Sequence, residues 1–522
     1  MDPRSFIGKR LGDHDIPTPA AVLDRAVVER NCIGMLAAVQ NMNLGWRAHI
    51  KTHKGRATGH ITVELTRLQV GDKLPVQLIV STVLEAERVL PLLKACQTQT
   101  TPAPRSVNIL YGVPLYAAAV PRLAAVAREL GPGGVSVLID HPDQIAVAQQ
   151  LVKAAGTSVR AFVKVDMGTH RAGVVLGSSQ FTATIQGVLG AHAAGEGLSF
   201  YGLYCHAGHS YDAREPWAAL AHLVAEFTAL GEAAQAVRSM AQDKAQVAAA
   251  AAGAQPWPLV LSVGASPTAA SLRHPDLGGG GGDASRTADA GGRAGAAAKE
   301  NAATLRAKLD DLASQGYELE VHAGVQPVLD LQQLATHSWG GGGGRAETDD
   351  LALTVMADVV SAYPGRGAQG GDEFLVNAGC LALGREPVKN VPLASGAGGG
   401  PVYTGWGVVQ PWTSDSAASA ASAGAGSRVV PPGADFPRLL PADGDLGWWQ
   451  VGRISQEHGI LTWAGGPPPS AASLQPRLGQ RLRIWPNHAC IAGAGFSYYL
   501  VVDGTSENPD QVVDVWERWT GW

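Results

Sequence analysis

Residues 46–54 read Trp46-Arg-Ala-His-Ile-Lys-Thr-His-Lys54, and the interpretation of the whole chain depends on this stretch. Successive side chains of a β-strand point to opposite faces, so Arg47, His49 and Lys51 would share one face. A packed interior prefers apolar side chains at such positions. Two interpretations are therefore open. The stretch is either an edge strand whose basic face meets solvent, or an active-site strand that ends in a catalytic lysine.

Seven further short apolar segments follow this opening strand, and amphipathic helical patterns separate most of them. The apolar segments cover residues 78–81, 107–111, 135–139, 161–166, 200–206, 258–263 and 318–322. The helical patterns cover residues 28–39, after the N-cap candidate Asp24, and then 85–96, 115–130, 142–155 and 297–312. Eight short strands that alternate with helices over roughly 300 residues predict an α/β fold with a closed, TIM-like (β/α)8 barrel. An open, doubly wound parallel sheet is the structural alternative.

The remainder of the chain has a different pattern. From about residue 349, short β-rich segments follow one another with few helical patterns between them. They cover residues 354–363, 373–380, 448–455, 459–463, 481–485 and 498–503. We therefore expect a barrel over residues 16–345 and a mainly β domain built from residues 1–15 and 346–522.

Composition excludes several classes of function. The chain has 522 residues and a formal net charge of -5, with no basic excess and no Lys/Arg run, which argues against nucleic-acid binding. It shows neither a signal peptide nor an apolar stretch of the ~20 residues that a membrane span needs, so we expect a soluble, cytoplasmic protein. Its five cysteines are widely spaced and lack a C-x-x-C pair, which argues against a disulfide framework and a four-cysteine zinc site.

Glycine is unusually frequent, with 65 residues, many of them in short runs. The runs lie at residues 278–282, 340–344 and 398–400, and residues 414–427 are almost entirely Ser, Ala and Gly. Segments of this composition bury too little apolar surface to offset the entropy of ordering them. We interpret them as flexible surface insertions.

Polar residues stand at the ends of all eight predicted strands, where barrels collect their reacting groups. They are Lys51, His53, Thr82, Tyr111, Asp140, Asp166, Thr169, His170, Arg171, Tyr204, His206, His209, Ser262, Ser266, Thr268 and His322. The turn Gly264-Ala-Ser-Pro-Thr268 offers backbone N–H groups and hydroxyls to a phosphate. A buried lysine near a phosphate site indicates pyridoxal phosphate, because a desolvated amine loses its proton readily and forms a Schiff base.

Several motifs together carry a resemblance to a known family. They are Asp15-Ile-Pro-Thr-Pro, Arg47-Ala-His-Ile-Lys-Thr-His-Lys54, Val163-Lys-Val-Asp-Met-Gly-Thr-His-Arg-Ala-Gly-Val174, Tyr204-Cys-His-Ala-Gly-His-Ser-Tyr211, Ser262-Val-Gly-Ala-Ser-Pro-Thr268, Val376-Asn-Ala-Gly379, Ser455-Gln-Glu-His-Gly459 and Pro486-Asn-His-Ala-Cys490. In this order the chain resembles the eukaryotic D-serine dehydratases. These belong with the D-threonine aldolases and, more distantly, the alanine racemases, all barrel-type pyridoxal-phosphate enzymes.

The resemblance implies roles for individual residues. Lys51 matches the lysine that holds the cofactor as a Schiff base, and Lys54 is the trailing, structural lysine. The cofactor-binding residues implied at the phosphate loop and near the cofactor ring are Gly264, Ala265, Ser266, Thr268, Arg171, Tyr204, His206 and Tyr211. The resemblance also implies an alanine-racemase-type barrel and a homodimer.

His488 and Cys490 match a zinc pair in this family. Two residues apart on a strand, their side chains would face the same side. On spacing alone the pair is weak, because a buried free cysteine beside a histidine is the ordinary explanation. Two protein ligands leave positions open for water and substrate, as catalytic zinc requires. The aldolases usually carry a carboxylate at the second position, whereas the Cys490 thiolate suits zinc, which favours a dehydratase.

The sequence departs from the family after the eighth strand, where relatives show His-Pro-Gly-Asn-Tyr and this chain has His322-Ala-Gly-Val-Gln326. The resulting hypothesis is zinc-assisted, pyridoxal-phosphate-dependent dehydration of D-serine to pyruvate and ammonia, with D-threonine as a further candidate substrate. Two alternatives stay open: a D-threonine or D-3-hydroxyamino-acid aldolase on the same fold, and a non-catalytic pyridoxal-phosphate-binding protein.

Overall fold

The computed structural model describes residues 2–54, 63–100, 103–248, 259–278, 293–338, 350–388, 403–411, 448–464 and 475–522. The chain divides into two compact units. The barrel unit comprises the described residues of Cys32–Gln326, Ser338–Gly344 and Gly521–Trp522. The sheet unit comprises those of Met1–Asn31, Pro327–His337 and Arg345–Thr520.

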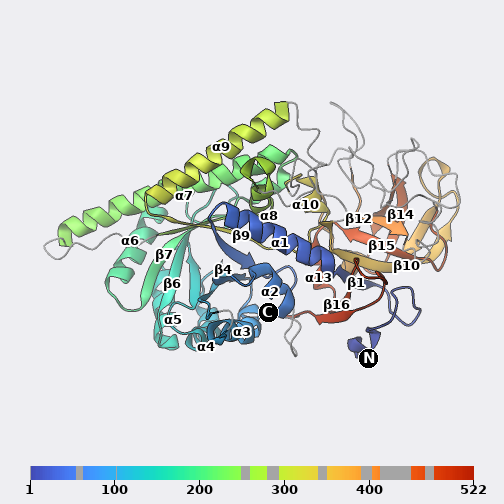
Figure 1. Cartoon of the computed structure of the whole chain (residues 1–522), viewed down its shortest axis with the longest axis horizontal. Helices are drawn as coiled ribbons and strands as arrows, with labels where there is room; N and C mark the ends of the chain where they lie inside the picture. The colour runs from blue at the N-terminus through green and yellow to red at the C-terminus, as the bar shows by residue number, and fades with distance from the viewer. Residues whose placement is uncertain are drawn as a thin grey trace. The chain divides into compact units, whose positions relative to one another are not determined.

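The barrel unit contains a closed ring of eight parallel strands, which confirms the predicted barrel and rules out the open sheet (Figure 1). The last strand pairs with the first, with Arg47 opposite His322, so the ring has no free edge. The strands are β2 Gly45–His49, β3 Val76–Val80, β4 Val107–Pro114, β5 Val135–Ile139, β6 Val159–Lys164, β7 Leu198–Tyr204, β8 Val260–Val263 and β9 Glu318–Ala323.

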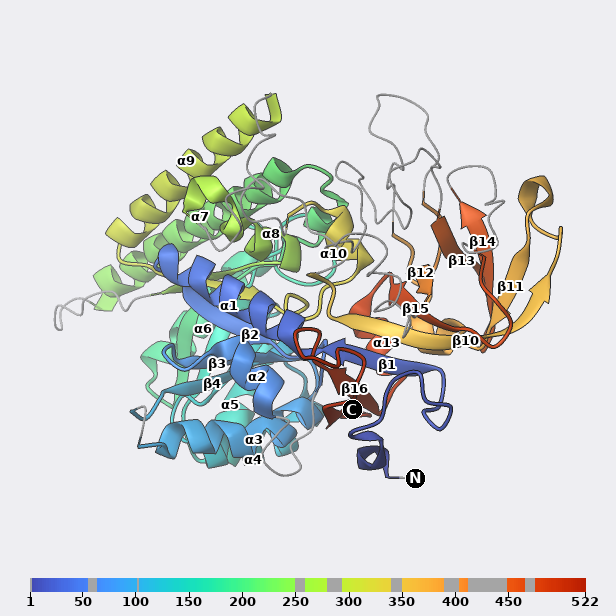
Figure 2. The ribbon, with the colours of Figure 1, turned by 45° about the vertical axis from the view of Figure 1, so that its right-hand side comes forward.

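Helices follow the barrel strands, and local capping explains where several of them begin. Thr82 accepts a hydrogen bond from the Glu85 N–H at the start of α3, and Ser178 does the same for Phe181 at the start of α6. Helices α7 and α9 lie side by side (Figure 2). The helices are α1 Arg25–Asn41, α2 Val63–Val70, α3 Val83–Thr98, α4 Val120–Leu130, α5 Gln144–Ala155, α6 Ser179–Ala193, α7 Pro216–Ala248, α8 Ser266–Ala270 and α9 Arg293–Ser314.

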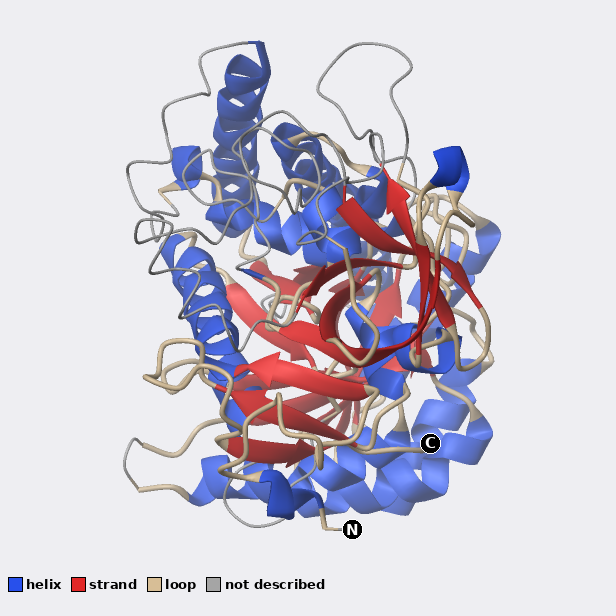
Figure 3. Cartoon of the chain, turned by 90° about the vertical axis from the view of Figure 1, so that its right-hand side faces the viewer, coloured by secondary structure: helices blue, strands red, loops and turns tan. Residues whose placement is uncertain are grey.

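The sheet unit is built on a nine-stranded sheet in the order β11-β14-β13-β12-β15-β10-β1-β16-β17. Because β11 also pairs with β10, the strands from β10 to β15 close on themselves, and the curvature is visible in Figure 3. Phe374, Trp449 and Leu461 belong to the apolar core of this closed part. The strands are β1 Ala20–Asp24, β10 Leu353–Tyr363, β11 Glu373–Val376, β12 Gly407–Pro411, β13 Trp448–Ile454, β14 Gly459–Ala464, β15 Arg481–Pro486, β16 Tyr498–Val502 and β17 Asp514–Glu517, and short helices are α10 Leu331–Ala335, α11 Cys380–Leu383 and α13 Ala489–Ala494.

The boundary between the units differs from the expected barrel range of residues 16–345. Strand β1 pairs antiparallel with β10 and parallel with β16, so residues 20–24 belong to the sheet rather than to the barrel. Residues 327–337 also fall in the sheet unit. Strands β1, β12 and β17 were not predicted. The partners of β1, strands β10 and β16, are distant in sequence, whereas β17 pairs with the preceding strand β16.

The glycine-rich runs, apart from Gly278, and residues 414–427 lie outside the described residues. Within the described ranges, no helix combines the length and the apolar character needed to cross a membrane.

Candidate active site

Arg47 lies inside the barrel, where its side chain is fully buried. Its guanidinium pairs with Glu320 through two hydrogen bonds, Nε–Oε1 at 2.7 Å and Nη2–Oε2 at 3.0 Å. It also donates to Asn108 Oδ1 at 2.7 Å. Arg47 thus points inward, as the alternation predicted, but these contacts make it a structural residue that ties strands β2, β4 and β9 together.

A chain of hydrogen bonds leads from this ion pair to His322. The ionised Glu320 only accepts hydrogen bonds, so the Ser262 hydroxyl gives its proton to Oε1 at 2.7 Å. Ser262 Oγ must then accept from His322 Nδ1, 3.1 Å away. This fixes the proton on Nδ1 and leaves His322 Nε2 as an acceptor. Nε2 is buried, with no hydrogen-bond partner among the described residues.

His206 reaches the same tautomer by a different contact. Its Nδ1 lies 2.7 Å from the carbonyl oxygen of Gly264, and because a carbonyl only accepts, Nδ1 carries the proton. Burial lowers the pKa of His206 to about 3, and the charges of Arg171 and Lys51 act in the same direction. Burial likewise holds the pKa of His322 well below its ordinary value. Both imidazoles are therefore neutral near pH 7 and present Nε2 as an acceptor.

Lys51 does not continue the opening strand, which ends at His49. It lies in the turn that follows, closed by a hydrogen bond from the Lys54 N–H to the Ile50 carbonyl at 3.0 Å. Burial lowers the pKa of His49 and of His206, and the Lys51 charge acts in the same direction on both. Lys54 instead forms an ion pair with buried Glu85 on α3, with Nζ–Oε1 at 3.2 Å. That pairing gives Lys54 a structural role.

Lys164 is a buried lysine that the sequence patterns did not single out as a site residue. It ends strand β6, is 7 % exposed, and its ammonium lies 5.6 Å from the centre of the Tyr204 ring. Burial, followed by the charge of Arg171, lowers the pKa of Lys164 to about 8. The strand repeat could have indicated that Lys164 points inward, because it stands two residues after Phe162, whose ring lies in the apolar core inside the barrel.

These side chains form one group, which we call the strand-end cluster. Tyr204 stacks on His322 with ring centroids 4.2 Å apart and an angle of 7° between the rings. Arg171 is exposed, and its charge acts on Lys164, Tyr204 and His206. Tyr211 lies in the turn Gly208–Asp212 after β7 and is partly buried. The strand-end cluster consists of Lys51, Lys164, Arg171, Tyr204, His206 and His322.

The predicted phosphate loop follows strand β8 and is largely bonded to the protein itself. The Gly264 N–H donates to Glu226 Oε1 at 3.2 Å, and the Ala265 N–H donates to Thr268 Oγ1 at 2.8 Å. Among the described residues, Ser266 Oγ accepts a long hydrogen bond from the Val325 N–H, at 3.4 Å, and its hydroxyl can still donate its own proton. Ser266 is therefore the residue of this loop best suited to hold a phosphate, while Gly264, Ala265 and Thr268 shape the turn.

The predicted metal pair lies in the sheet unit. The sequence pattern predicted that His488 and Cys490 lie on a strand, and this prediction is wrong. Strand β15 ends at Pro486, His488 is the N-cap of α13, and Cys490 lies in that helix. The helical turn nevertheless brings the two side chains into contact, since the His488 ring hydrogen-bonds to Cys490. Burial lowers the pKa of His488, but this bond and the charges of Cys490, Asp330 and Glu386 outweigh it and raise the pKa to about 9.

The donor set at this pair suits zinc. His488 Nδ1 is buried and has no hydrogen-bond partner in the described part of the chain, so this nitrogen can bind a metal that displaces its proton. An imidazole nitrogen and a thiolate are ligands that zinc prefers. Asp330 is not counted as a metal ligand, because its carboxylate oxygens already accept hydrogen bonds from the Gln333 N–H at 2.9 Å and the Ala489 N–H at 2.8 Å. The described residues contain no group of three or more His, Cys, Asp or Glu arranged to hold a metal.

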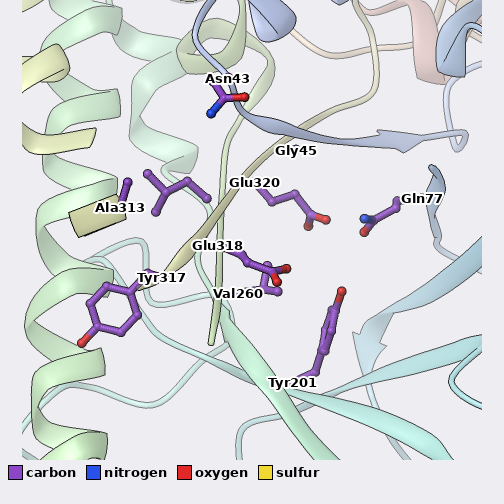
Figure 4. A pocket seen from close by; sticks show the side chains of 10 residues that line it. Asn43, Gly45, Gln77, Tyr201, Val260, Ala313, Tyr317, Glu318 and Glu320 are labelled. Carbon is purple, nitrogen blue, oxygen red and sulfur yellow. The ribbon is translucent and has the colours of Figure 1, made fainter. Parts of the chain in front are cut away.

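A cavity of about 320 Å³ lies at the other end of the barrel, where the strands begin (Figure 4). It is lined by Gly45, Gln77, Tyr201, Glu318 and Glu320, among others. In Figure 4 Glu320 and Gln77 point toward each other, and both also bond to Arg47. None of the residues of the strand-end cluster lines this cavity, which borders the structural ion pair.

Comparisons with known proteins show which family and fold the chain resembles. Residues 352–502 match the family described as "Putative serine dehydratase domain", and residues 49–277 match "Alanine racemase, N-terminal domain". A D-serine dehydratase of Schizosaccharomyces pombe is 30% identical over 99% of this chain and 95% of its own length. A D-serine dehydratase of Saccharomyces cerevisiae is 28% identical, with 97% of each chain covered. Among solved structures, a cysteine-to-alanine variant of D-threo-3-hydroxyaspartate dehydratase in its metal-free form has a TM-score of 0.63 at 23% identity, covering 97% of this chain and 99% of that one.

Proposed function

This chain belongs to the D-serine dehydratase family of pyridoxal-phosphate enzymes, and we propose that it converts D-serine to pyruvate and ammonia with the help of zinc. In this reaction D-serine loses its α-proton and its hydroxyl as water. The aminoacrylate that forms then takes up water and gives pyruvate and ammonia. We also infer a homodimer, which sedimentation of the purified protein would test.

The observation that carries the proposal is the strand-end cluster. The charges of Lys51, Lys164 and Arg171 all act on the His206 imidazole, and the charge of Lys164 also acts on His322, while burial keeps both imidazoles neutral. Three basic side chains suit a ligand that brings a phosphate and a carboxylate, because both groups are anions. The neutral Nε2 atoms of His206 and His322 accept hydrogen bonds from donors of the bound molecule.

Lys51 would hold pyridoxal phosphate covalently, and Ser266 would bind its phosphate. The cofactor, when bound, supplies the electron sink that lowers the barrier to breaking the α C–H bond. The Lys51 amine is the base that we assign to the α-proton, since it stands at the end of β2 among the other members of the cluster.

His488 and Cys490 would hold the zinc ion. A Lewis acid there would assist the substrate hydroxyl in leaving. A thiolate at this place favours zinc and the dehydratase, whereas a carboxylate would suit the manganese or magnesium associated with the aldolase alternative.

A pyruvate assay with D-serine and L-serine, each with and without a chelator, tests the proposal. We expect pyruvate from D-serine alone, and loss of that activity in verified zinc-free protein that returns when zinc is added. Full activity without zinc would contradict the role of the metal. Bound cofactor without turnover of any D-amino acid would instead support the non-catalytic alternative.

D-Threonine separates the dehydratase from the aldolase. A dehydratase gives 2-oxobutanoate and ammonia, whereas an aldolase gives glycine and acetaldehyde. We expect the first pair of products. Glycine and acetaldehyde as the main products would overturn the assignment while leaving the cofactor in place.

A further inference from the structure

Glu226 is a buried carboxylate for which the proposed reaction has no use. It lies on α7, and its side chain is fully buried behind the ends of strands β7 and β8. Its Oε1 accepts hydrogen bonds from the Ala207 N–H at 2.8 Å and from the Gly264 N–H at 3.2 Å. Burial raises the pKa of Glu226 to about 7, and the hydrogen bonds from Thr268, Ala207 and Gly264 oppose that rise.

Burial of a carboxylate lowers the stability of the fold unless an ion pair or hydrogen bonds compensate its charge. No ion pair with a Lys or Arg compensates Glu226 among the residues that the structure describes. An apolar side chain would avoid the cost of removing the carboxylate from water. Its contacts, rather than its contribution to stability, therefore indicate what it does.

Those contacts fix the peptide units around Gly264 from two sides. Glu226 binds the Gly264 N–H, and His206 Nδ1 donates to the Gly264 carbonyl at 2.7 Å. Ala207, the second residue that Glu226 holds, directly follows His206. Gly264 itself has φ +143, and a Cβ there would lie 2.1 Å from the His322 carbonyl oxygen, so only glycine fits. Glu226, Gly264, His206 and Ala207 thus form a closed circuit of covalent and hydrogen bonds.

We propose that Glu226 is a positioning residue that sets the phosphate end of the cofactor site. By holding the Gly264 and Ala207 N–H groups with one oxygen, it fixes the direction in which the chain leaves β8 and hence the place of Ser266. The inference rests on the proposed function, in which Ser266 binds the cofactor phosphate.

Titration of the cofactor-free, full-length protein with pyridoxal phosphate and with pyridoxal tests this role, because pyridoxal lacks the phosphate. In Glu226→Ala we expect the Kd for pyridoxal phosphate to rise about tenfold or more, as expected for the loss of hydrogen bonds to a charged group. The Kd for pyridoxal should change less than about threefold. Glu226→Gln keeps an acceptor oxygen and should stay within about threefold of the wild type for both ligands.

Two control variants on the same helix separate positioning from general damage. Leu230→Ala removes a fully buried side chain one turn away and should lower stability without changing the ratio of the two Kd values. Glu232→Ala removes an exposed carboxylate and should change neither the stability nor the ratio of the two Kd values. If Glu226→Ala fails to fold, Glu226→Asp, whose shorter side chain cannot reach both N–H groups, replaces it with the same expectation.

Equal weakening of both ligands in Glu226→Ala, or the same ratio change in Leu230→Ala, would overturn the inference. A wild-type protein that binds pyridoxal phosphate but does not turn over D-serine would overturn the reaction and leave the positioning role measurable. A wild-type protein that binds no pyridoxal phosphate would overturn both.

Discussion

Arg47 and Glu320 form a buried two-bond ion pair across the seam where strands β2 and β9 close the barrel. Both side chains are at most 3% exposed. Removal of one partner leaves a buried charge without compensation, which typically costs several kcal/mol. The pair also orients Ser262 and, through it, His322, so the closure of the barrel and the tautomer of a cluster residue depend on the same contact.

Glu320→Ala should lower the free energy of unfolding by about 3–5 kcal/mol, because Arg47 then stays buried without its partner. Urea unfolding monitored by circular dichroism measures the change. The double variant Arg47→Met with Glu320→Leu should be less destabilised than Glu320→Ala, since it removes both charges. A loss of less than about 1 kcal/mol in Glu320→Ala would show that the pair is not essential.

His206→Asn should remove part of the acid sensitivity of the fold. His206 has its pKa lowered to about 3 in the folded protein, while an unfolded histidine titrates near 6.5. Between these values the unfolded state binds the proton and the folded state does not, so wild-type stability falls as the pH drops below 6.5. Asparagine keeps a donor for the Gly264 carbonyl and does not titrate.

The stability advantage of the wild type over His206→Asn should therefore shrink by about 1.4 kcal/mol per pH unit below pH 6.5. Urea unfolding of cofactor-free protein at several pH values between 7.5 and 5 measures it. The same substitution at the exposed His141 is the control. Buried Glu226 acts with the opposite sign between about 4.5 and 7, but it is present in all three proteins and cancels in the comparison.

Lys51→Ala should abolish the visible absorption of covalently held cofactor and the formation of pyruvate. Lys54→Ala is the matched control, because it removes an amine from the same turn that is paired with Glu85. It should keep the absorption band and lose mainly stability. An unchanged spectrum in Lys51→Ala would contradict the assignment of Lys51 as the lysine that holds the cofactor. Loss of the band in Lys54→Ala alone would assign that role to Lys54.

His488→Ala and Cys490→Ala should each lose bound zinc and reduce pyruvate formation by about 100-fold or more, since each removes one of two protein ligands. Elemental analysis of the purified proteins, together with the D-serine assay, measures both effects. Cys380→Ala, at another partly buried cysteine of the sheet unit, should retain metal and activity. Zinc that persists in both variants would place the metal elsewhere.

The sequence by itself determined the barrel, because periodicity and strand count are local properties. Side-chain alternation located the opening strand and short apolar runs located the other seven, and the placement of Lys51 and His206 at strand ends followed from them. The family resemblance, carried by motifs from the first strand to Cys490, is confirmed by relatives aligned over nearly the whole chain. The individual site assignments drawn from it stay predictions.

Only the tertiary structure decided which polar residues are structural. Arg47 and Lys51 share a face in the sequence pattern. In the structure Arg47 forms an ion pair with Glu320, whereas Lys51 lies in the turn beyond the strand. The burial of Lys164 on β6 and of Glu226 on α7 likewise depends on the packing around these elements. The physical reason is that a strand's two-residue repeat gives the direction of a side chain, whereas its depth, its partners and its charge state depend on residues hundreds of positions away.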